Sequence, residues 1–432
     1  MNIFSFKIFQ FLYLTIEIVT KISYYILPFK TQYPLKIIPE KYFEIKFYNE
    51  PRTILTVGTH EQLIPCYLSI NTDITYISGS NSILNKNEPK YNEYKSKKYH
   101  NISNKIEYNS LYIYGIPSVD VILLNKDKNI DIKFYLTESK FSSNELNYSC
   151  ILGFGYDSVL IDFEDDYSYS NKIESFITQM KNNEIINKKI FFINYNQTDD
   201  NGEIILGSYP HEIKNNYCES LCYEDDYIEI ENNFINDMDI IWSIKGYIFI
   251  GEKQIYEYLC SIDFELNQGF IIGSRDYKEN IEKHFFNENI SKKICFKKDI
   301  YIKNDVFEVF YCRKGVDMST FDSLKIYVSK IKYEIIFDYK DIFEEKDEYL
   351  FFNVIFAKHE FYFRHDFILG KPFFKKYPVV FNVEGKVEKI GFYQNLFIKI
   401  KDNKNQRDII NNNSEYKWNK LNFYSIKFIL GH

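Results

Sequence analysis

The feature that most constrains this chain is a succession of short apolar segments between polar turns, which fills most of residues 40–395. The segments are roughly four to eight residues long and rich in β-branched and aromatic side chains, as in RTILTVGT, VDVILLN and KIFFINYN. Such runs are typical of β-strands. One segment, NKIESFITQMKNN, instead carries apolar residues at helical spacing. The pattern therefore predicts an all-β fold with a few short helices.

Size and composition indicate a globular chain that is long enough for two domains. Of its 432 residues, 45% are apolar and 26% are charged. The formal net charge is −7, from 53 basic and 60 acidic side chains. The composition gives no overall basic field, so we expect no nucleic-acid partner.

The seven cysteines are an odd count, and two pairs of them are close in sequence. Cys218 lies near Cys222, and Cys295 and Cys312 bracket a short segment. Local pairs of this kind suit disulfides in a secreted protein, with buried thiols as the alternative. No spacing resembles a zinc site, and we expect no metal or other cofactor.

The N-terminal segment 1–30 combines Lys7 with an apolar stretch, which is typical of a signal peptide or signal anchor. Gln10, Glu17 and Lys21 interrupt the stretch, so we expect no clean transmembrane span. The segment predicts a secretory-pathway protein that is secreted, at the cell surface or in a secretory organelle, with membrane association through the N-terminus as an option. Five N-glycosylation sequons are compatible with this location: Asn101, Asn147, Asn196, Asn289 and Asn412.

An apolar-apolar-Gly segment occurs once in each half of the chain, as SCILGFG at 149–155 and DFILGKPFF at 366–374. Each copy follows an earlier strand that ends in polar residues, LSIN in the first half and SIDF in the second. This indicates an internal duplication. We therefore expect four segments: a leader at 1–30, an N-terminal β lobe at 40–215, a C-terminal β lobe at 216–393 and an Asn- and Lys-rich tail at 394–432.

The longest family resemblance lies in FILGKPFFKKYPVVFNVEGKVEKIGFY at 367–393. It resembles the closing strands of pepsin-like aspartic proteases, where apolar-apolar-Gly, an aromatic pair, a Tyr, an apolar-apolar-Phe-Asp and a final Ile-Gly-Phe follow in this order. IEYNSLYIYGIPSVDVILL resembles the family's flap hairpin, with Tyr108 at the flap-tyrosine position. The resemblance covers roughly residues 50–393. It implies a bilobal pepsin-like fold with a cleft between the lobes.

The same resemblance bears on the cysteines. Cys295 and Cys312 fall where the family's C-terminal lobe has a disulfide. Cys66 and Cys260 each lie three residues before a position expected to be catalytic, and Cys150 precedes the Ile-Leu-Gly segment of the first lobe. A Cys66–Cys150 pair is conceivable because these strands are neighbours in the family, but we expect all three to be buried free thiols.

The residues that carry out hydrolysis in the family are altered here. The family uses Asp-Thr/Ser-Gly twice. In LSINTDITYI, Ser69 takes the place of the first catalytic Asp, while Thr72 and Tyr76 keep the places of a hydroxyl residue and an aromatic residue. In SIDFELN, Asp263 keeps the second Asp and Glu265 replaces the Gly. The candidate contacts of a bound substrate are Thr72, Tyr76 and Tyr108.

These changes predict a loss of catalysis. In the family's mechanism two carboxylates about 3 Å apart share one proton, so that one activates a water and the other donates a hydrogen bond to the substrate. The hydroxyl of Ser69 is not appreciably ionised near neutral pH, and Asp263 alone lacks its coupled partner. The alternative is an aspartic endopeptidase with a divergent pair, in which Asp73 or Glu265 joins Asp263.

The sequence thus predicts a catalytically inactive, pepsin-like protein of the secretory pathway with a binding or scaffold role. Its interlobe cleft is expected to hold a protein or an extended peptide through backbone pairing. A membrane-anchored structural protein that uses the N-terminal stretch is a further option.

Overall fold

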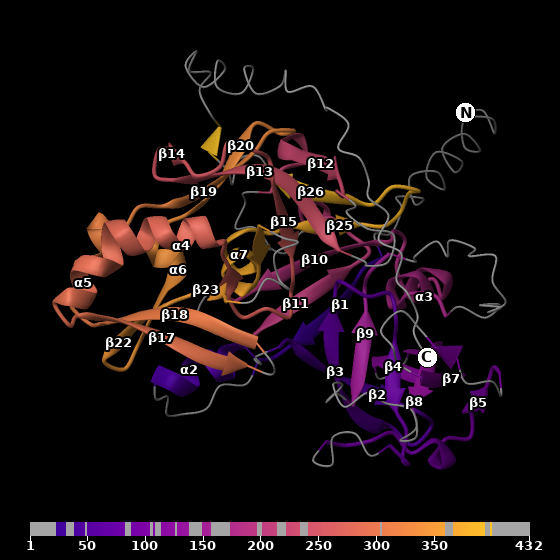
Figure 1. Ribbon diagram of the computed structural model, residues 1–432. Helices are drawn as coiled ribbons and strands as arrows, with labels where there is room; N and C mark the ends of the chain where they lie inside the picture. The colour runs from indigo at the N-terminus through magenta and orange to yellow at the C-terminus, as the bar shows by residue number, and fades with distance from the viewer. Residues whose placement is uncertain are drawn as a thin grey trace, which may run out of the picture.

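The computed structural model is built mainly from β-strands with a few short helices, which confirms the predicted all-β class (Figure 1). Most of the predicted leader and nearly all of the predicted tail lie outside the residues that the structure describes. Within the described part of the chain, no helix is long and apolar enough to cross a membrane. The described residues are 23–31, 39–47, 50–82, 88–103, 107–108, 114–125, 128–137, 149–156, 173–196, 201–213, 222–233, 241–302, 305–358, 366–393 and 398–399.

The first sheet has eight strands, and all of them come from residues 52–153. Its main path runs in the order β2-β3-β9-β4-β8-β7-β5, and β6 pairs with β7. The strands are β2 (Arg52–Val57), β3 (Gln62–Ser69), β4 (Tyr76–Ser78), β5 (His100–Asn101), β6 (Glu107–Tyr108), β7 (Tyr114–Asn125), β8 (Lys128–Thr137) and β9 (Cys150–Gly153).

The second sheet has thirteen strands from residues 242–399. Its main path runs β21-β22-β18-β23-β16-β24-β15-β13-β19-β20-β27, with β14 on β13 and β17 on β18. The strands are β13 (Trp242–Ile250), β14 (Lys253–Gln254), β15 (Cys260–Phe264), β16 (Ile271–Ile272), β17 (Cys295–Ile302), β18 (Asp305–Arg313), β19 (Leu324–Val328), β20 (Tyr333–Phe337), β21 (Phe343–Lys346), β22 (Tyr349–Phe352), β23 (Val354–Ala357), β24 (Phe367–Leu369) and β27 (Ile398–Lys399).

A third sheet of six strands draws on distant parts of the chain and lies between the other two (Figure 1). Its order is β1-β11-β10-β25-β26-β12, so strands from the N-terminal, middle and C-terminal parts of the chain pair side by side. The strands are β1 (Tyr25–Phe29), β10 (Ile190–Tyr195), β11 (Gly202–Leu206), β12 (Tyr227–Glu231), β25 (Val380–Asn382) and β26 (Lys389–Tyr393).

The helices are short and lie between the strands. The expected helix in NKIESFITQMKNN is α3, and the Ser175 hydroxyl caps it by accepting the N–H of Thr178. The helices are α2 (Pro39–Phe47), α3 (Phe176–Asn182), α4 (Arg275–Ile281), α5 (Asn287–Ser291), α6 (Tyr339–Ile342) and α7 (Lys371–Lys376), with one π-turn at η5 (Glu282–Phe286) and 3-10 turns at η1 (Glu93–Lys95), η3 (Pro210–Glu212), η4 (Glu224–Asp226) and η6 (Met318–Thr320).

The first and second sheets repeat one strand arrangement. In the first, β9 lies between β3 and β4, parallel to β3 and antiparallel to β4, and β4 runs parallel to β8. In the second, β24 lies between β15 and β16 with the same directions, and β16 runs parallel to β23. The two inserted strands, β9 and β24, carry the two apolar-apolar-Gly segments. The duplication in the sequence is therefore a duplication of structure.

Trp242 of β13 joins the three sheets at the centre of the molecule. Its side chain is fully buried, with ring centroids 4.9 Å from Phe381 of β25 and 6.3 Å from Phe191 of β10. Its indole Nε1 donates a hydrogen bond of 2.8 Å to the carbonyl of Ile70, the residue after β3. This side chain of the second sheet therefore contacts the third sheet and the loop that follows β3 of the first sheet.

Two disulfides are present among the described residues. Cys295 and Cys312 are bonded, as expected. Cys66 and Cys150 are also bonded, so the expected free thiols at these positions are wrong. The parallel register pairs Tyr67 with Ile151, which brings the two preceding cysteines opposite each other.

The remaining cysteines behave differently. Cys260 is a buried free thiol, as expected. Cys222 is disulfide-bonded, whereas Cys218 lies outside the described residues, so the Cys218–Cys222 pair stays a prediction. The two described disulfides fit an oxidising, secretory or extracellular location.

The two disulfides should contribute unequally to stability because they close loops of different length. The sequence separations are 84 residues for Cys66–Cys150 and 17 for Cys295–Cys312. Chain entropy predicts a loss of about 4 to 5 kcal/mol when the first pair is replaced by alanines, against about 3 kcal/mol for the second. Urea unfolding of the two double variants measures this order, and an equal or reversed order would contradict it.

Candidate functional site

The two altered motifs lie on equivalent strands of the two repeats, and the strand register decides which residues correspond. Ser69 of β3 pairs with Gly153, the last residue of the Ile-Leu-Gly segment in β9. Asp263 of β15 pairs with Ile368, the first residue of the same segment in β24. The residue opposite Gly370, the glycine of the second segment, is therefore Glu265, which lies two positions after Asp263. Sequence reasoning matched Asp263 with Ser69, whereas the register matches Glu265 with Ser69.

Gly153 and Gly370 cannot carry a side chain, because the backbone of a loop passes directly over each of them. A Cβ atom at Gly153 would lie 2.6 Å from backbone atoms of Asp73 and Ile74. A Cβ atom at Gly370 would lie 2.2 Å from carbonyl oxygens of the loop 266–270. In each repeat the loop after the candidate position thus crosses directly over a glycine, which explains the apolar-apolar-Gly segments physically.

The two loops meet at the junction of the repeats. Asn71, two residues after Ser69, donates its side-chain Nδ2 to the carbonyl of Phe264 at 3.2 Å. Asn267 holds the equivalent place after Glu265. The Oδ1 atoms of both asparagines are buried and have no hydrogen-bond partner among the described residues. The junction therefore has a pair of matched asparagines, one in each of the two repeats.

The equivalent positions hold one carboxylate rather than two. Ser69 is half-buried and contributes a hydroxyl, and Glu265 is half-buried and contributes a carboxyl group. Asp263 is 4% exposed and accepts a 3.5 Å hydrogen bond from the Ser261 hydroxyl. Asp73 is buried in the loop that crosses the first glycine. A proton-sharing pair made of one carboxylate from each of these two positions is therefore not possible, because Ser69 has no carboxyl group.

Helix α2 covers the side of the second sheet on which Asp263 lies. Residues paired across a β-ladder point to the same face, so Asp263 shares its face with Ile368. Ile368 packs in one buried cluster with Tyr42 and Phe43 of α2. The Tyr42 ring also stacks on Phe351, with centroids 3.8 Å apart. In Figure 1, α2 lies below β17 and β18, away from the first sheet that follows it in sequence.

Lys46 fixes the C-terminal end of α2 beside the candidate site. Its ammonium group bonds to Glu344, to the Asn353 side-chain oxygen at 2.9 Å and to the Tyr42 hydroxyl at 3.0 Å. These three acceptors match the three protons of the ammonium group, which is 3% exposed. A Cβ atom at Gly269 would lie 2.1 Å from the Lys46 carbonyl oxygen, so the helix touches the loop that follows Glu265.

Sequence reasoning missed α2, although the segment PEKYFEIKF carries signals of a helix. Pro39 stands at the start of the helix, where its missing N–H and fixed φ are tolerated. Tyr42, Phe43, Lys46 and Phe47 then fall on one helical face. The first two pack in the second sheet's buried cluster, with Phe47 at its edge.

The other candidate residues have structural contacts. Thr72 is buried, and its hydroxyl accepts the N–H of Ile74 within the loop. Tyr76 is fully buried, and this burial raises the pKa of its hydroxyl. Tyr108 belongs to a hairpin, where it pairs with Tyr114 of β7, and its side chain is outside the described residues. Nowhere in the described ranges do three His, Cys, Asp or Glu side chains form a group that could hold a metal ion.

The contact between Lys46 and Glu344 should make the packing of α2 sensitive to acid. Burial acts to raise the pKa of Glu344, but the charge of Lys46 and hydrogen bonds from Lys46 and Tyr42 outweigh it and lower this pKa to about 2. A lowered pKa stabilises the fold above the ordinary value of 4.5, and this stabilisation disappears as the pH falls toward 2. Glu344→Gln should therefore lower the urea midpoint at pH 6, with a smaller difference from wild type near pH 2.

The matched control is Glu345→Gln. The neighbouring Glu345 pairs with Lys314 and its side chain is 62% exposed, so its loss should change the midpoint little at either pH. A constant difference between wild type and Glu344→Gln at both pH values would contradict the assignment.

Comparison with known proteins does not identify a family for this chain. No protein-family model matches it. No curated protein matches it in sequence either.

Proposed function

We propose that this chain is a non-catalytic, pepsin-like protein of the secretory pathway with a protein-binding or scaffold role. The observation that carries the proposal is the strand register, which sets Ser69 and Glu265 at equivalent positions of the two repeats. A two-carboxylate acid mechanism that uses these two positions cannot operate, because one of them is a serine. The fold needs no carboxylate there, so it can persist without the chemistry.

A bilobal pepsin-like fold accounts for the arrangement of the sheets. Each repeat would be one lobe, and the six-stranded sheet would join them. The closing segment at 367–393 contributes β24, α7, β25 and β26, in the order that the family resemblance implies. The hydrogen bond from Asn71 to Phe264 brings the two loops together, as a cleft between two such lobes requires.

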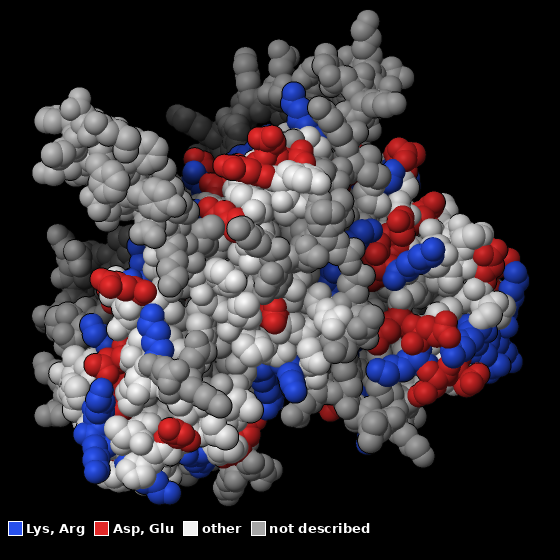
Figure 2. Space-filling model, turned by 180° about the vertical axis from the view of Figure 1, so that it is seen from behind, with Lys and Arg blue, Asp and Glu red and all other residues white. Residues whose placement is uncertain are grey.

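The partner that we propose is a protein or an extended peptide. Such a ligand can pair its backbone with an exposed strand or hairpin, as peptides do on other β-sheets. Because α2 already covers the face around Asp263, we expect the ligand along the first repeat and its β6–β7 hairpin. On the face shown in Figure 2, the basic side chains alternate with acidic ones, which gives nucleic acid no continuous basic surface.

Secretion is also part of the proposal. The Cys66–Cys150 and Cys295–Cys312 disulfides support an oxidising compartment. The predicted signal peptide or signal anchor at 1–30, with membrane association as an option, falls mostly outside the described residues.

One observation favours the alternative of an active aspartic endopeptidase. Asp263 lies in β15 and Glu265 directly follows this strand, so the two carboxyl groups are only two residues apart in the chain. Two acidic groups so placed could share a proton without any help from Ser69. This pair is the divergent dyad that the experiment has to exclude.

Hydrolysis of an unfolded protein substrate from about pH 2 to pH 7 tests the proposal. We expect no cleavage by the purified chain, no effect of pepstatin, and the same background rate in Asp263→Asn and Glu265→Gln. General acid–base catalysis contributes about 10² to 10⁴ in rate, so a genuine enzyme would lose a measurable signal in these variants.

The control variant is Glu231→Gln, which removes an exposed carboxylate at the end of β12. Acid-dependent, pepstatin-sensitive cleavage that disappears in Asp263→Asn and Glu265→Gln but persists in Glu231→Gln would overturn the proposal and establish the divergent pair.

A further inference from the structure

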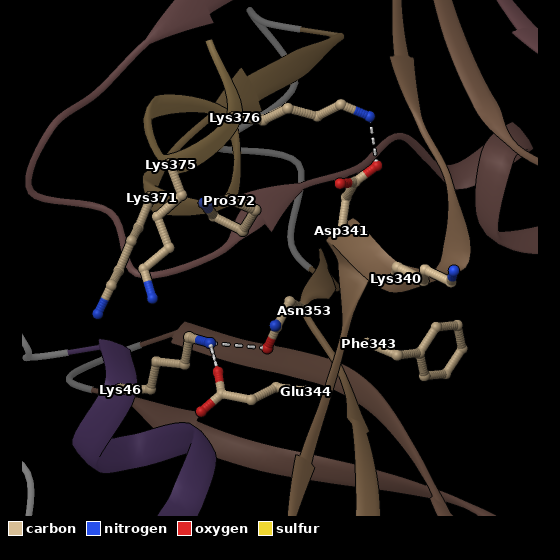
Figure 3. A pocket seen from close by; sticks show the side chains of 10 residues that line it. All are labelled: Lys46, Lys340, Asp341, Phe343, Glu344, Asn353, Lys371, Pro372, Lys375 and Lys376. Carbon is tan, nitrogen blue, oxygen red and sulfur yellow. Dashed lines mark hydrogen bonds and ion pairs between the residues drawn. The ribbon is translucent and has the colours of Figure 1, made fainter. Parts of the chain in front are cut away.

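The charged cavity between α2, α6 and α7 does not define a ligand by itself (Figure 3). Its volume is about 320 Å³, but both carboxylates of its wall already have partners. Figure 3 shows Lys46 bonded to Glu344 and Lys376 bonded to Asp341. The other two lysines of α7 have partners as well. A polar group that is left to solvent lies instead in the first repeat.

This group is the side-chain amide of Asn101, which is exposed on β5. Its Oδ1 accepts a hydrogen bond of 2.5 Å from the Tyr99 hydroxyl and one of 3.4 Å from the Ser118 hydroxyl. No described residue accepts a hydrogen bond from its Nδ2. The fold therefore holds the amide oxygen and leaves the amide nitrogen accessible.

Asn101 is also the first residue of an Asn-Ile-Ser sequon at 101–103, all of which the structure describes. Strand β5 holds Asn101 extended against β7, where it pairs with Ser118. The Ile102 side chain is 41% exposed, and Ser103 is half-buried. β5 stands at the end of the strand order of the first sheet, on the outside of the molecule (Figure 1). The sequon is thus extended and at the surface.

The sequon at Asn289 has a different environment. Asn289 lies in α5, and its Nδ2 donates a 2.9 Å hydrogen bond to the Phe285 carbonyl, one turn earlier. The residue is half-buried, so a sugar on this nitrogen would have to displace that contact. The other three sequons lie wholly or partly outside the described residues, at Asn147, Asn196 and Asn412.

We propose that Asn101 carries an N-linked glycan in the folded protein. The donor is an oligosaccharide on a lipid pyrophosphate. Nδ2 of Asn101 bonds to C1 of the first sugar and gives up one proton. The bond from C1 to the pyrophosphate oxygen breaks, and the lipid pyrophosphate leaves with its electron pair. The inference rests on the proposed secretory location, where proteins meet this donor.

A glycan at Asn101 would cover the open edge of the first sheet. Among the described residues, β5 pairs with β7 alone. An uncovered strand edge can pair with another chain, and a bulky, solubilising sugar blocks such pairing. The glycan would therefore direct an extended peptide to the β6–β7 hairpin rather than to β5.

Mass spectrometry of the secreted full chain tests the site. The chain is expressed behind an added signal peptide in a eukaryotic secretory host, with a reporter sequon appended at its C-terminus. Peptide-N-glycosidase in water that contains heavy oxygen converts each glycosylated Asn to a labelled Asp. The tryptic peptide 99–105 holds Asn101 as its only sequon. We expect the label at Asn101 and none at Asn289.

Ser103→Ala is the decisive variant, because it removes the hydroxyl of the sequon and leaves Asn101 in place. We expect it to abolish the label at Asn101, whereas Ser103→Thr should retain it. The matched control is Ser291→Ala, which makes the same change in the sequon of Asn289 and should leave the labelling pattern unchanged.

An unlabelled Asn101 in a chain whose reporter sequon is labelled would overturn the proposal. A label that persists in Ser103→Ala, or equal labelling of Asn289, would overturn it as well. The same chain with its own N-terminus tests the secretory location separately. Failure of that chain to enter the pathway, together with a labelled Asn101 behind the added signal peptide, would contradict the proposed location and support the assignment of Asn101.

Discussion

The hydrogen bond from the Trp242 indole to the Ile70 carbonyl is the contact on which the arrangement of the two halves depends. The indole is fully buried among strands of the central sheet, so its N–H needs an acceptor inside the protein. Leaving either group unsatisfied would cost about 1 to 3 kcal/mol. The bond holds the end of β3 against β13, and the neighbouring Asn71 can then reach Phe264. The two candidate loops are brought together by packing and backbone contacts rather than by catalytic groups.

The packing at the junction does not depend on which polar residues occupy the two equivalent positions. Gly153 and Gly370 have no alternative, because the crossing loops leave no room for a Cβ atom. Ser69 and Glu265 stand where the chain only has to turn, and the loops meet without a carboxylate pair. Helix α2 also packs against this part of the second sheet, where Tyr42 and Phe43 cover the face beside Asp263 with buried aromatic side chains. On the side of the second sheet, the space beside the junction is thus occupied by helix α2.

The sequence predicted the strand-rich class and the Cys295–Cys312 disulfide, because both are written locally in residue choice and spacing. The equivalence of Glu265 with Ser69 could not be predicted from the local sequence around the two loops. Asp263 and Glu265 are two residues apart, and a two-residue shift leaves the alternation of a strand unchanged. The pairing with β24, more than a hundred residues later, decides between them. The Cys66–Cys150 bond and the packing of α2 on the second sheet likewise depend on partners that are distant in sequence.

A carboxyl titration by NMR, with isotope-labelled Asp and Glu side chains, tests the central claim most directly. If the junction of the repeats holds a single carboxylate, Glu265 titrates in one step, and Asp263→Asn leaves its titration curve unchanged. A two-step titration of Glu265 that collapses to one step in Asp263→Asn or Asp73→Asn would reveal a coupled acid pair. That result would contradict the account of a non-catalytic junction.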